Sequence, residues 1–298
     1  MLNTFGPKGL STGSTGPTYF LNMKLFQFLA AIVALTIASA VPAFGGEAPS
    51  REGVNVGKKS SFTNLVPATE VERGAARQYE QLKQHALRQH ALAPDDHPQV
   101  HRLRAIARKM LPFTSKWNER AKGWRWEVNL VGSTQINAFC MPGGKIAFYT
   151  GIIDSLKLTD DEIAVVMGHE VAHALREHAR ERMGKQAATH LGANLASQML
   201  GLGNLGNVAL GAGVNLLTLK FSRDDETEAD LVGLELAARS GYNPSAGISL
   251  WTKMQQAAKG APPQWLSTHP ASNARITVIT RHLPEVMPLY ERARTGPG

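Results

Sequence analysis

The sequence predicts an α+β fold in which helices predominate and a small sheet lies beside one buried helix. Three patterns lead to this prediction: a capped, strongly apolar helical segment at 159–174, a second capped helix at 222–241, and alternating apolar residues before the first helix that indicate strands. The chain has 298 residues, is 43% hydrophobic and shows no internal repeat. One main domain with a single core is therefore expected.

The first 40 residues are expected to direct export rather than to belong to the fold. Lys24 precedes an apolar run over 25–40 that ends in Ala38-Ser39-Ala40, the pattern of a secretory signal, and residues 1–22 form an extension before it. No cysteine follows this run, which excludes a lipoprotein anchor. Retention of the run as a membrane anchor is the alternative.

The rest of the chain divides into three parts: a polar linker over 41–68, the main domain over 69–285 and a flexible tail over 286–298. Within the main domain we expect helices near 70–90, 98–110, 244–258 and 271–282, a strand at 124–130, and a hairpin whose strands, 135–140 and 146–150, are joined by a turn at 141–145.

The sequence His169-Glu-Val-Ala-His173 carries the clearest chemical signal. Residues four apart share one face of a helix, so His169 and His173 can bind one metal ion, and Glu170 points beside that face. Zinc lowers the pKa of a bound water to about 7, and a neighbouring carboxylate can take its proton. A capping box at 159–162 and the apolar residues that follow support a helix here.

A catalytic zinc has three protein ligands and one open position, so a third ligand is required. His178 is excluded because, nine residues from His169, it would turn to the opposite side of a continuous helix. Glu177 shares the face of His173 but lies about 12 Å along the axis from His169. The third ligand must come from another helix.

The segment 222–230 supplies that ligand. Ser222 can cap a helix in which Glu226 and Asp230 lie four apart on one face, so that Glu226 can bind the metal and Asp230 can hydrogen-bond a ligating histidine. Asp225 and Glu228 point elsewhere. An acidic, solvated helix face is the alternative for this pattern taken alone.

These motifs resemble the zinc peptidase family that groups CAAX prenyl proteases, HtpX-type proteases and bacterial periplasmic quality-control metallopeptidases. The likeness extends to the segment 136–151 and to Ser267-Thr-His-Pro270, and covers roughly residues 70–285. It implies a zincin-like, gluzincin-type catalytic domain with one Zn²⁺ bound by His169, His173 and Glu226, and with Glu170 as general base. The family describes the aspartate at Asp230 as a proton donor, so both roles stay open for it.

The hairpin offers a way to hold a substrate. A strand just before the metal helix can pair with an extended peptide, and we assign Asn137, Ala138 and Phe139 to substrate binding. The alternative is a hairpin that only covers the core. His269 can lie over the open metal position, where it would stabilise the oxyanion or cap the metal, or else it is a loop residue that caps the next helix. Arg275 is expected to form a structural ion pair.

Residues 186–219 contain no charged side chain, and we expect them to form water-excluded helices around the metal helices, with a lid or a membrane contact as alternatives. Cys140 is the only cysteine, so no intramolecular disulfide can form. Removal of residues 1–40 leaves 30 basic against 24 acidic residues, a net of +6 that could favour peripheral contact with anionic lipid. No nucleic-acid-binding motif accompanies this charge.

The resemblance implies a periplasmic zinc endopeptidase that cuts unfolded or misassembled envelope proteins. Two other functions remain open. One is a chaperone or assembly factor whose zinc site is mostly closed, and the other is a membrane-associated protease, which the lack of several clear spanning helices disfavours.

Overall fold

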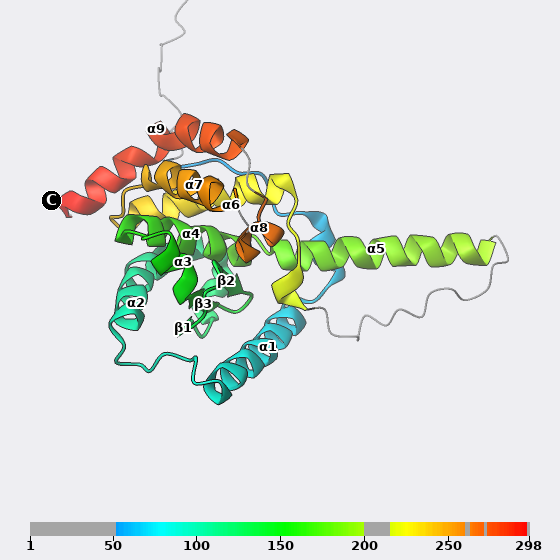
Figure 1. Cartoon of the computed structure of the whole chain (residues 1–298). Helices are drawn as coiled ribbons and strands as arrows, with labels where there is room; N and C mark the ends of the chain where they lie inside the picture. Colours follow the sequence, from blue (N-terminus) through cyan, green and yellow to red (C-terminus); the bar gives the residue numbers. More distant parts are fainter. Residues whose placement is uncertain (1–51, 200–214, 260–262, 271–272, 297–298) are drawn as a thin grey trace, which may run out of the picture. The chain divides into compact units, whose positions relative to one another are not determined.

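The computed structural model describes residues 52–199, 215–259, 263–270 and 273–296 (Figure 1). The expected signal segment over 1–40 lies outside these ranges. No helix within them combines the length and the hydrophobicity that crossing a membrane requires. The described residues form a helix-dominated α+β fold with a small sheet, as the sequence predicts.

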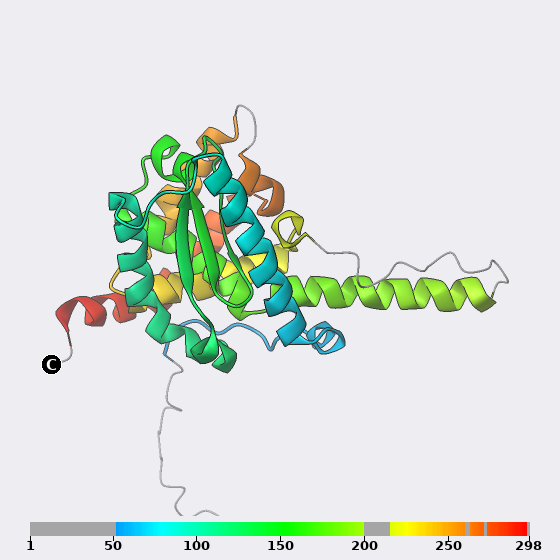
Figure 2. The same ribbon diagram turned by 90° about the horizontal axis from the view of Figure 1, so that it is seen from below.

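The sheet has three strands, β1 (Glu127–Val131), β2 (Ala138–Met141) and β3 (Lys145–Tyr149), in the order β1-β3-β2. The predicted hairpin is confirmed, because β2 and β3 pair antiparallel. β1 pairs parallel with β3 rather than with its neighbour in sequence, so β3 is central and β2 lies at an edge. Helices α1 (Ala68–Arg88) and α2 (Pro98–Met110) flank the sheet (Figure 2).

Helix α4 (Asp160–Leu175) follows the short α3 (Thr150–Ser155) and is buried along nearly its whole length. The predicted capping box is present: the Thr159 hydroxyl accepts from the main-chain N–H of Glu162, and the Glu162 carboxylate accepts from the N–H of Thr159. The box satisfies free N–H groups at the start of a helix that lies inside the core.

Helix α6 (Arg223–Arg239) crosses α4 at two glycines, and the two helices lie side by side in Figure 1. A Cβ on Gly168 would lie 2.6 Å from the carbonyl oxygen of Gly233, and a Cβ on Gly233 would lie 2.6 Å from the main-chain nitrogen of His169. Any larger residue would push the helices apart. Helices α7 (Ala246–Ala257) and α9 (Asn273–Thr295) pack against this pair.

Two expected boundaries differ from the structure. The described part of the 41–68 segment is not a free linker: Val54 and Val66 are buried, the N–H of Val54 donates to Glu235 at 2.9 Å, and 61–65 form the short helix η1 (Ser61–Leu65). At the other end, α9 continues to Thr295 through the segment expected to be a flexible tail. Val286 and Leu289 are buried there, which compensates for the main-chain hydrogen bonds that two internal prolines remove.

The described part of the uncharged segment over 186–219 does not form the water-excluded helices that the sequence predicts. Its first part belongs to α5 (His178–Met199), whose far half extends away from the other helices in Figures 1 and 2. Thr189, His190 and Leu191 are exposed, so this part is not a water-excluded helix beside α4. Residues 200–214 lie outside the described ranges, and the short helix η4 (Leu216–Thr218) then returns to β2.

Candidate metal centre

Four buried side chains from three places in the chain meet at one point. His169 and His173 come from α4, Glu226 comes from α6, and His269 follows the short helix α8 (Gln264–Thr268). One nitrogen or oxygen atom from each lies within 4.8 Å of the others, and all four residues are 2–3% exposed. The crossing of α4 and α6 thus brings together the three residues that the sequence proposed as ligands.

The spacing of the four donors matches a tetrahedral metal site. His169 Nε2 lies 3.1 Å from His173 Nε2, 3.6 Å from a Glu226 oxygen and 3.2 Å from His269 Nδ1, and His173 Nε2 lies 3.5 Å from the other Glu226 oxygen. Zinc bonds of about 2.0–2.1 Å in a tetrahedron place the ligand atoms about 3.3 Å apart. Three imidazoles and one carboxylate are donors that zinc accepts, so this donor set fits one zinc ion.

Asp230 orients His169 from behind. One Asp230 oxygen lies 3.0 Å from His169 Nδ1. Arg275 Nη2 lies 3.2 Å from the same nitrogen, but the Asp230 contact is shorter and a carboxylate can only accept. We therefore assign the ring proton to Nδ1, which leaves the lone pair of Nε2 toward the other donors. The structure therefore places Asp230 behind His169, on the side away from the other three donors.

Arg275 joins the two carboxylates of α6. Its guanidinium donates to both Asp230 oxygens, at 2.7 and 2.6 Å, and also to Glu226, and its central carbon lies 3.6 Å from the centroid of the Trp251 ring. Arg275 is 5% exposed, so one buried positive charge lies between two buried carboxylates and offsets one of their two negative charges. The sequence anticipated an ion pair for Arg275 but not its place inside the centre.

The surroundings of His173, Glu226 and Asp230 favour the protonation states that metal binding requires, whereas at His269 burial is outweighed by Glu170 and Glu226, which raise its pKa. Burial lowers the pKa of His173 well below its ordinary value, which keeps the ring neutral. Burial raises the pKa of Glu226, but hydrogen bonds and charge interactions with the neighbouring histidines outweigh burial and hold that pKa below its ordinary value. Burial likewise raises the pKa of Asp230, and Arg275 and His169 outweigh it, so its pKa is also lowered.

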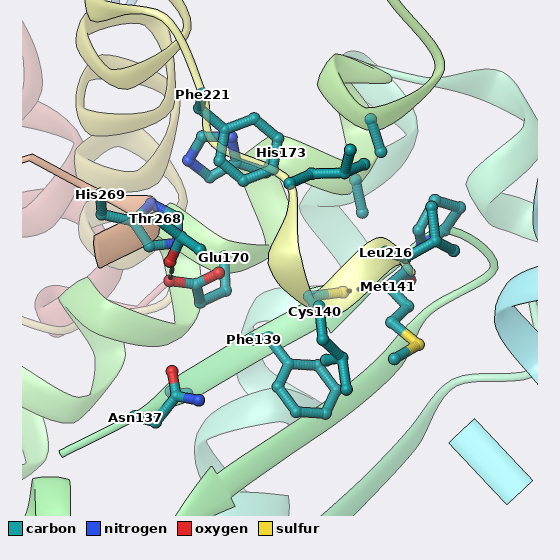
Figure 3. Close-up of a pocket in the computed structure, with 16 residues that line it drawn as sticks. Asn137, Phe139, Cys140, Met141, Glu170, His173, Leu216, Phe221, Thr268 and His269 are labelled. Atoms are coloured by element: carbon teal, nitrogen blue, oxygen red, sulfur yellow. Dashed lines mark hydrogen bonds and ion pairs between the residues drawn. The ribbon is translucent and has the colours of Figure 1, made fainter. Parts of the chain in front are cut away.

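Glu170 lies beside the donors without belonging to them. It is 2% exposed, and its Oε1 accepts a hydrogen bond of 2.6 Å from the indole N–H of Trp265, a residue of α8. His269 Nε2 lies 3.6 Å from the same oxygen. In Figure 3, Glu170, His173 and His269 face one another across a pocket, and the Phe221 ring stacks on His173 with 4.0 Å between ring centroids.

This pocket is a cavity of about 50 Å³ between the metal centre and β2. Asn137, Ala138 and Phe139, the proposed substrate-binding residues, all line it. Apolar side chains, among them Leu217, Leu219 and Phe221, form part of its lining. The pocket thus combines the polar groups of Glu170 and His269 with an apolar lining.

The edge of β2 carries main-chain groups that do not pair with β3, on two residues that are themselves buried, Ala138 at 1% and Cys140 at 8% exposed. The N–H of Tyr149 donates to the carbonyl of Asn137, which places Asn137 and, two residues on, Phe139 in hydrogen-bonded pairs with β3. The main chain of Ala138 and Cys140 therefore points outward. Just before them, the carbonyl of Ile136 accepts from the N–H of Trp265, so α8 covers the start of this edge.

Two residues excluded as ligands occupy unexpected places. Helix α4 ends at Leu175, and Glu177 has a left-handed φ of 62°, so the continuous helix assumed for His178 does not exist. His178 is instead buried directly behind His173, with its Nδ1 2.9 Å from that of His173. Glu177 lies outside the four-donor group and forms ion pairs with Lys59 and Arg180.

Sequence reasoning did not identify Trp265 or Phe221 as part of the site. Trp265 is fully buried and Phe221 directly precedes the cap of α6. Their proximity to Ser222 and to the Ser267-Thr-His-Pro270 segment was the only available signal. Neither residue has chemistry that a motif search would select.

The crossing of two buried helices with a histidine pair on one and a glutamate on the other, beside a small sheet, defines a zincin-like domain. The model of peptidase family M48 matches residues 99–283, and the chain belongs to this family.

The relatives are proteases by name, and two of the following three are named as metalloproteases. The chain is 31% identical to the mitochondrial metalloendopeptidase OMA1 of Saccharomyces cerevisiae over 69% of its own length and 62% of the relative. It is 29% identical to the beta-barrel assembly-enhancing protease of Yersinia pestis, over 50% of the chain and 32% of the relative. It is 27% identical to the metalloprotease LoiP of Escherichia coli, over 57% of the chain and 67% of the relative. The chain spans less than two thirds of the OMA1 proteins it matches.

Proposed function

We propose that the protein is a zinc endopeptidase in which His169, His173 and Glu226 bind the metal and Glu170 is the general base. The observation that carries this proposal is the position of Glu170: its carboxylate lies beside the four-donor group and lines a pocket that residues of β2 also line. Membership of peptidase family M48 and the names of the relatives support the reaction class.

Each residue contributes one step to hydrolysis. Zinc in this donor set would supply a Lewis acid that polarises a carbonyl and acidifies water. Glu170 accepts the proton of the attacking water and delivers it to the nitrogen of the leaving amine. The Trp265 N–H holds the Glu170 carboxylate in one orientation for both transfers. Asp230 keeps His169 in the tautomer that binds metal, and we prefer this role to that of a proton donor because both Asp230 oxygens are already engaged by Arg275.

We propose that His269 caps the centre in a resting form. Its Nδ1 takes the place of a fourth ligand, the position that a catalytic zinc site keeps for water or substrate. Withdrawal of His269 toward the pocket would open that position. Its contact with Glu170 would be lost in the same movement, which would release the base as well.

The substrate class follows from the edge of β2. Ala138 and Cys140 present main-chain groups that an extended peptide can pair with, so recognition would depend little on side chains. The apolar lining of the pocket would accept one apolar side chain of that peptide. Unfolded or misassembled proteins expose both features, and one relative is named for enhancing β-barrel assembly. We therefore propose such proteins as substrates.

We propose a periplasmic location, on the basis of the apolar run over 25–40. The net charge of the remaining chain would allow peripheral contact with an anionic membrane. Cell fractionation followed by carbonate extraction tests both statements. Firm retention in the membrane pellet would contradict export as a cleaved protein and favour an uncleaved anchor.

The test of the catalytic proposal compares the wild type with Glu170→Gln. The wild type should contain one zinc per chain and digest casein until a chelator is added, whereas Glu170→Gln should keep the zinc and lose digestion. A wild type that binds no zinc, or a Glu170→Gln variant that digests casein at the wild-type rate, would contradict the proposal.

A chaperone or assembly factor is the second candidate, and the closed fourth position favours it. A protein whose site stays capped would hold clients without cutting them. Two results together would favour this second function: Glu170→Gln suppresses aggregation as well as the wild type does, and His269→Ala does not digest casein.

A further inference from the structure

His178 and Glu228, which the metal group does not include, form a chain of hydrogen bonds behind His173. His178 is 1% exposed. Its Nδ1 lies 2.9 Å from Nδ1 of His173, and its Nε2 lies 2.8 Å from a carboxylate oxygen of Glu228. The other oxygen of Glu228 lies 2.6 Å from the guanidinium of Arg176, which is itself 7% exposed.

The backbone break between α4 and α5 makes this arrangement possible. Because Glu177 adopts a left-handed conformation, α5 starts in a new direction, and its first residue, His178, returns to the ring of His173. Glu228 reaches the same place from α6. Three elements of the fold thus converge on one side of one imidazole.

The proton positions along this chain follow from what each group can do. An arginine only donates, so the Glu228 carboxylate accepts from Arg176 and, through its other oxygen, from His178 Nε2–H. A neutral His178 then has its lone pair on Nδ1 and accepts from His173 Nδ1–H. His173 is left with the lone pair of Nε2, and this lone pair points at the metal group.

We propose that Arg176, Glu228 and His178 act as positioning residues that hold His173 in its metal-binding tautomer. This inference rests on the metal site of the proposed function. His169 achieves the same result through one direct carboxylate, Asp230, whereas His173 requires an intervening imidazole because Glu228 lies one ring further away. Partners of this kind affect metal affinity by about 10–100-fold.

The first test reads the tautomer of the wild-type chain directly. Two-dimensional ¹H–¹⁵N spectra of the histidine rings, recorded on the full chain after removal of metal, distinguish Nδ1–H from Nε2–H. We expect Nδ1–H for His173 and Nε2–H for His178. The opposite tautomer at either ring would overturn the inference, and this measurement requires no substitution.

The second test measures zinc affinity by competition with a chromophoric chelator. His178→Leu removes the acceptor, whereas His178→Asn places an amide oxygen close to the position of Nδ1. We expect His178→Leu to lose about 10–100-fold in affinity and His178→Asn to stay close to the wild type. His190→Leu, at an exposed position of the same helix, is the matched control and should bind zinc normally.

The outcomes separate this inference from the proposed function. A wild type that binds no zinc contradicts the proposed function. A wild type that binds zinc while His178→Leu binds it equally well, or while His178→Asn loses as much affinity as His178→Leu, contradicts the positioning role alone. Circular dichroism confirms that each variant is folded, and if His178→Leu does not fold, the tautomer spectra decide.

Discussion

The indole N–H of Trp265 donates a 2.6 Å hydrogen bond to Oε1 of Glu170, and both side chains are buried. Trp265 also stacks on Trp251, with ring centroids 5.2 Å apart, and its main-chain N–H donates to the carbonyl of Ile136, just before β2. One residue of a five-residue helix therefore connects the proposed base to the proposed docking strand.

Trp265→Phe should lower kcat by about ten-fold with little change in KM, because it removes one hydrogen bond to a charged group that acts in the chemical step. Steady-state casein digestion measures both constants. Trp251→Phe is the matched control: its indole N–H is buried and has no hydrogen-bond partner among the described residues, so the loss of the N–H should leave kcat near the wild-type value. Equal losses in the two variants would show that ring packing, and not the bond to Glu170, matters.

His269→Ala should raise the rate of casein digestion several-fold, since it removes the donor that closes the fourth position. If His269 instead stabilised the oxyanion, its loss would lower kcat by about a hundred-fold or more. The sign of the change therefore separates the two roles left open by the sequence. Thr268→Ala controls for disturbance of the end of α8 and should show neither effect.

Ala138→Pro should lower kcat/KM for casein by about ten-fold while sparing a short ester substrate that cannot extend along β2. Proline removes an outward N–H at an edge strand, where it does not break the pairs with β3. Ala138→Gly keeps that N–H and should digest casein normally. Undiminished casein digestion by Ala138→Pro would rule out docking on this edge. A proline at Ala147 is a weaker test of docking, because β3 is the central strand and the proline would disturb its hydrogen bonds with the neighbouring strands.

Glu162→Gln should lower the free energy of unfolding by roughly 1–2 kcal/mol at pH 7, and the difference from the wild type should vanish in acid. Burial raises the pKa of Glu162, but Lys253, the N–H of Thr159 and Ser249 outweigh it, so the folded pKa lies below the ordinary value of 4.5. A depressed folded pKa gives stability that is present above pH 4.5 and is lost as the pH falls through the folded pKa.

Urea unfolding at pH 7 and at about pH 3 measures this difference. Glu119→Gln is the control, because Glu119 forms an exposed pair with Lys122 that should contribute little at either pH. A difference between wild type and Glu162→Gln that is constant with pH would show that the ionised carboxylate is not the source of the stability.

The features that depend on local sequence were predictable. The caps at Thr159 and Ser222 are located by residues three apart, and helical periodicity alone brings His169 toward His173 and Glu226 toward Asp230. The β2–β3 hairpin follows from alternation and a glycine turn. These elements contain most of the proposed site, which explains why the site could be anticipated before the fold was known.

The features that depend on contacts between residues far apart in the sequence could not be predicted from the sequence. Nothing near Gly168 indicates that Gly233 will lie against it, and nothing in β1 indicates that it pairs with β3. The exclusion of His178 as a ligand assumed an unbroken helix, although Glu177, without the help of a glycine, turns the chain there. Tertiary packing determines such turns, and a single sequence does not reveal that packing.

Pairing of a client with the edge of β2 has a consequence for timing. A strand edge pairs only with a main chain whose own hydrogen bonds are open, so a client segment must remain extended for as long as it takes to align beside Ala138 and reach Glu170. A client that folds faster than it aligns would escape, and one that folds slowly would be cut. The cleavage rate would then measure a client's folding rate, with no need for the enzyme to identify any residue of it.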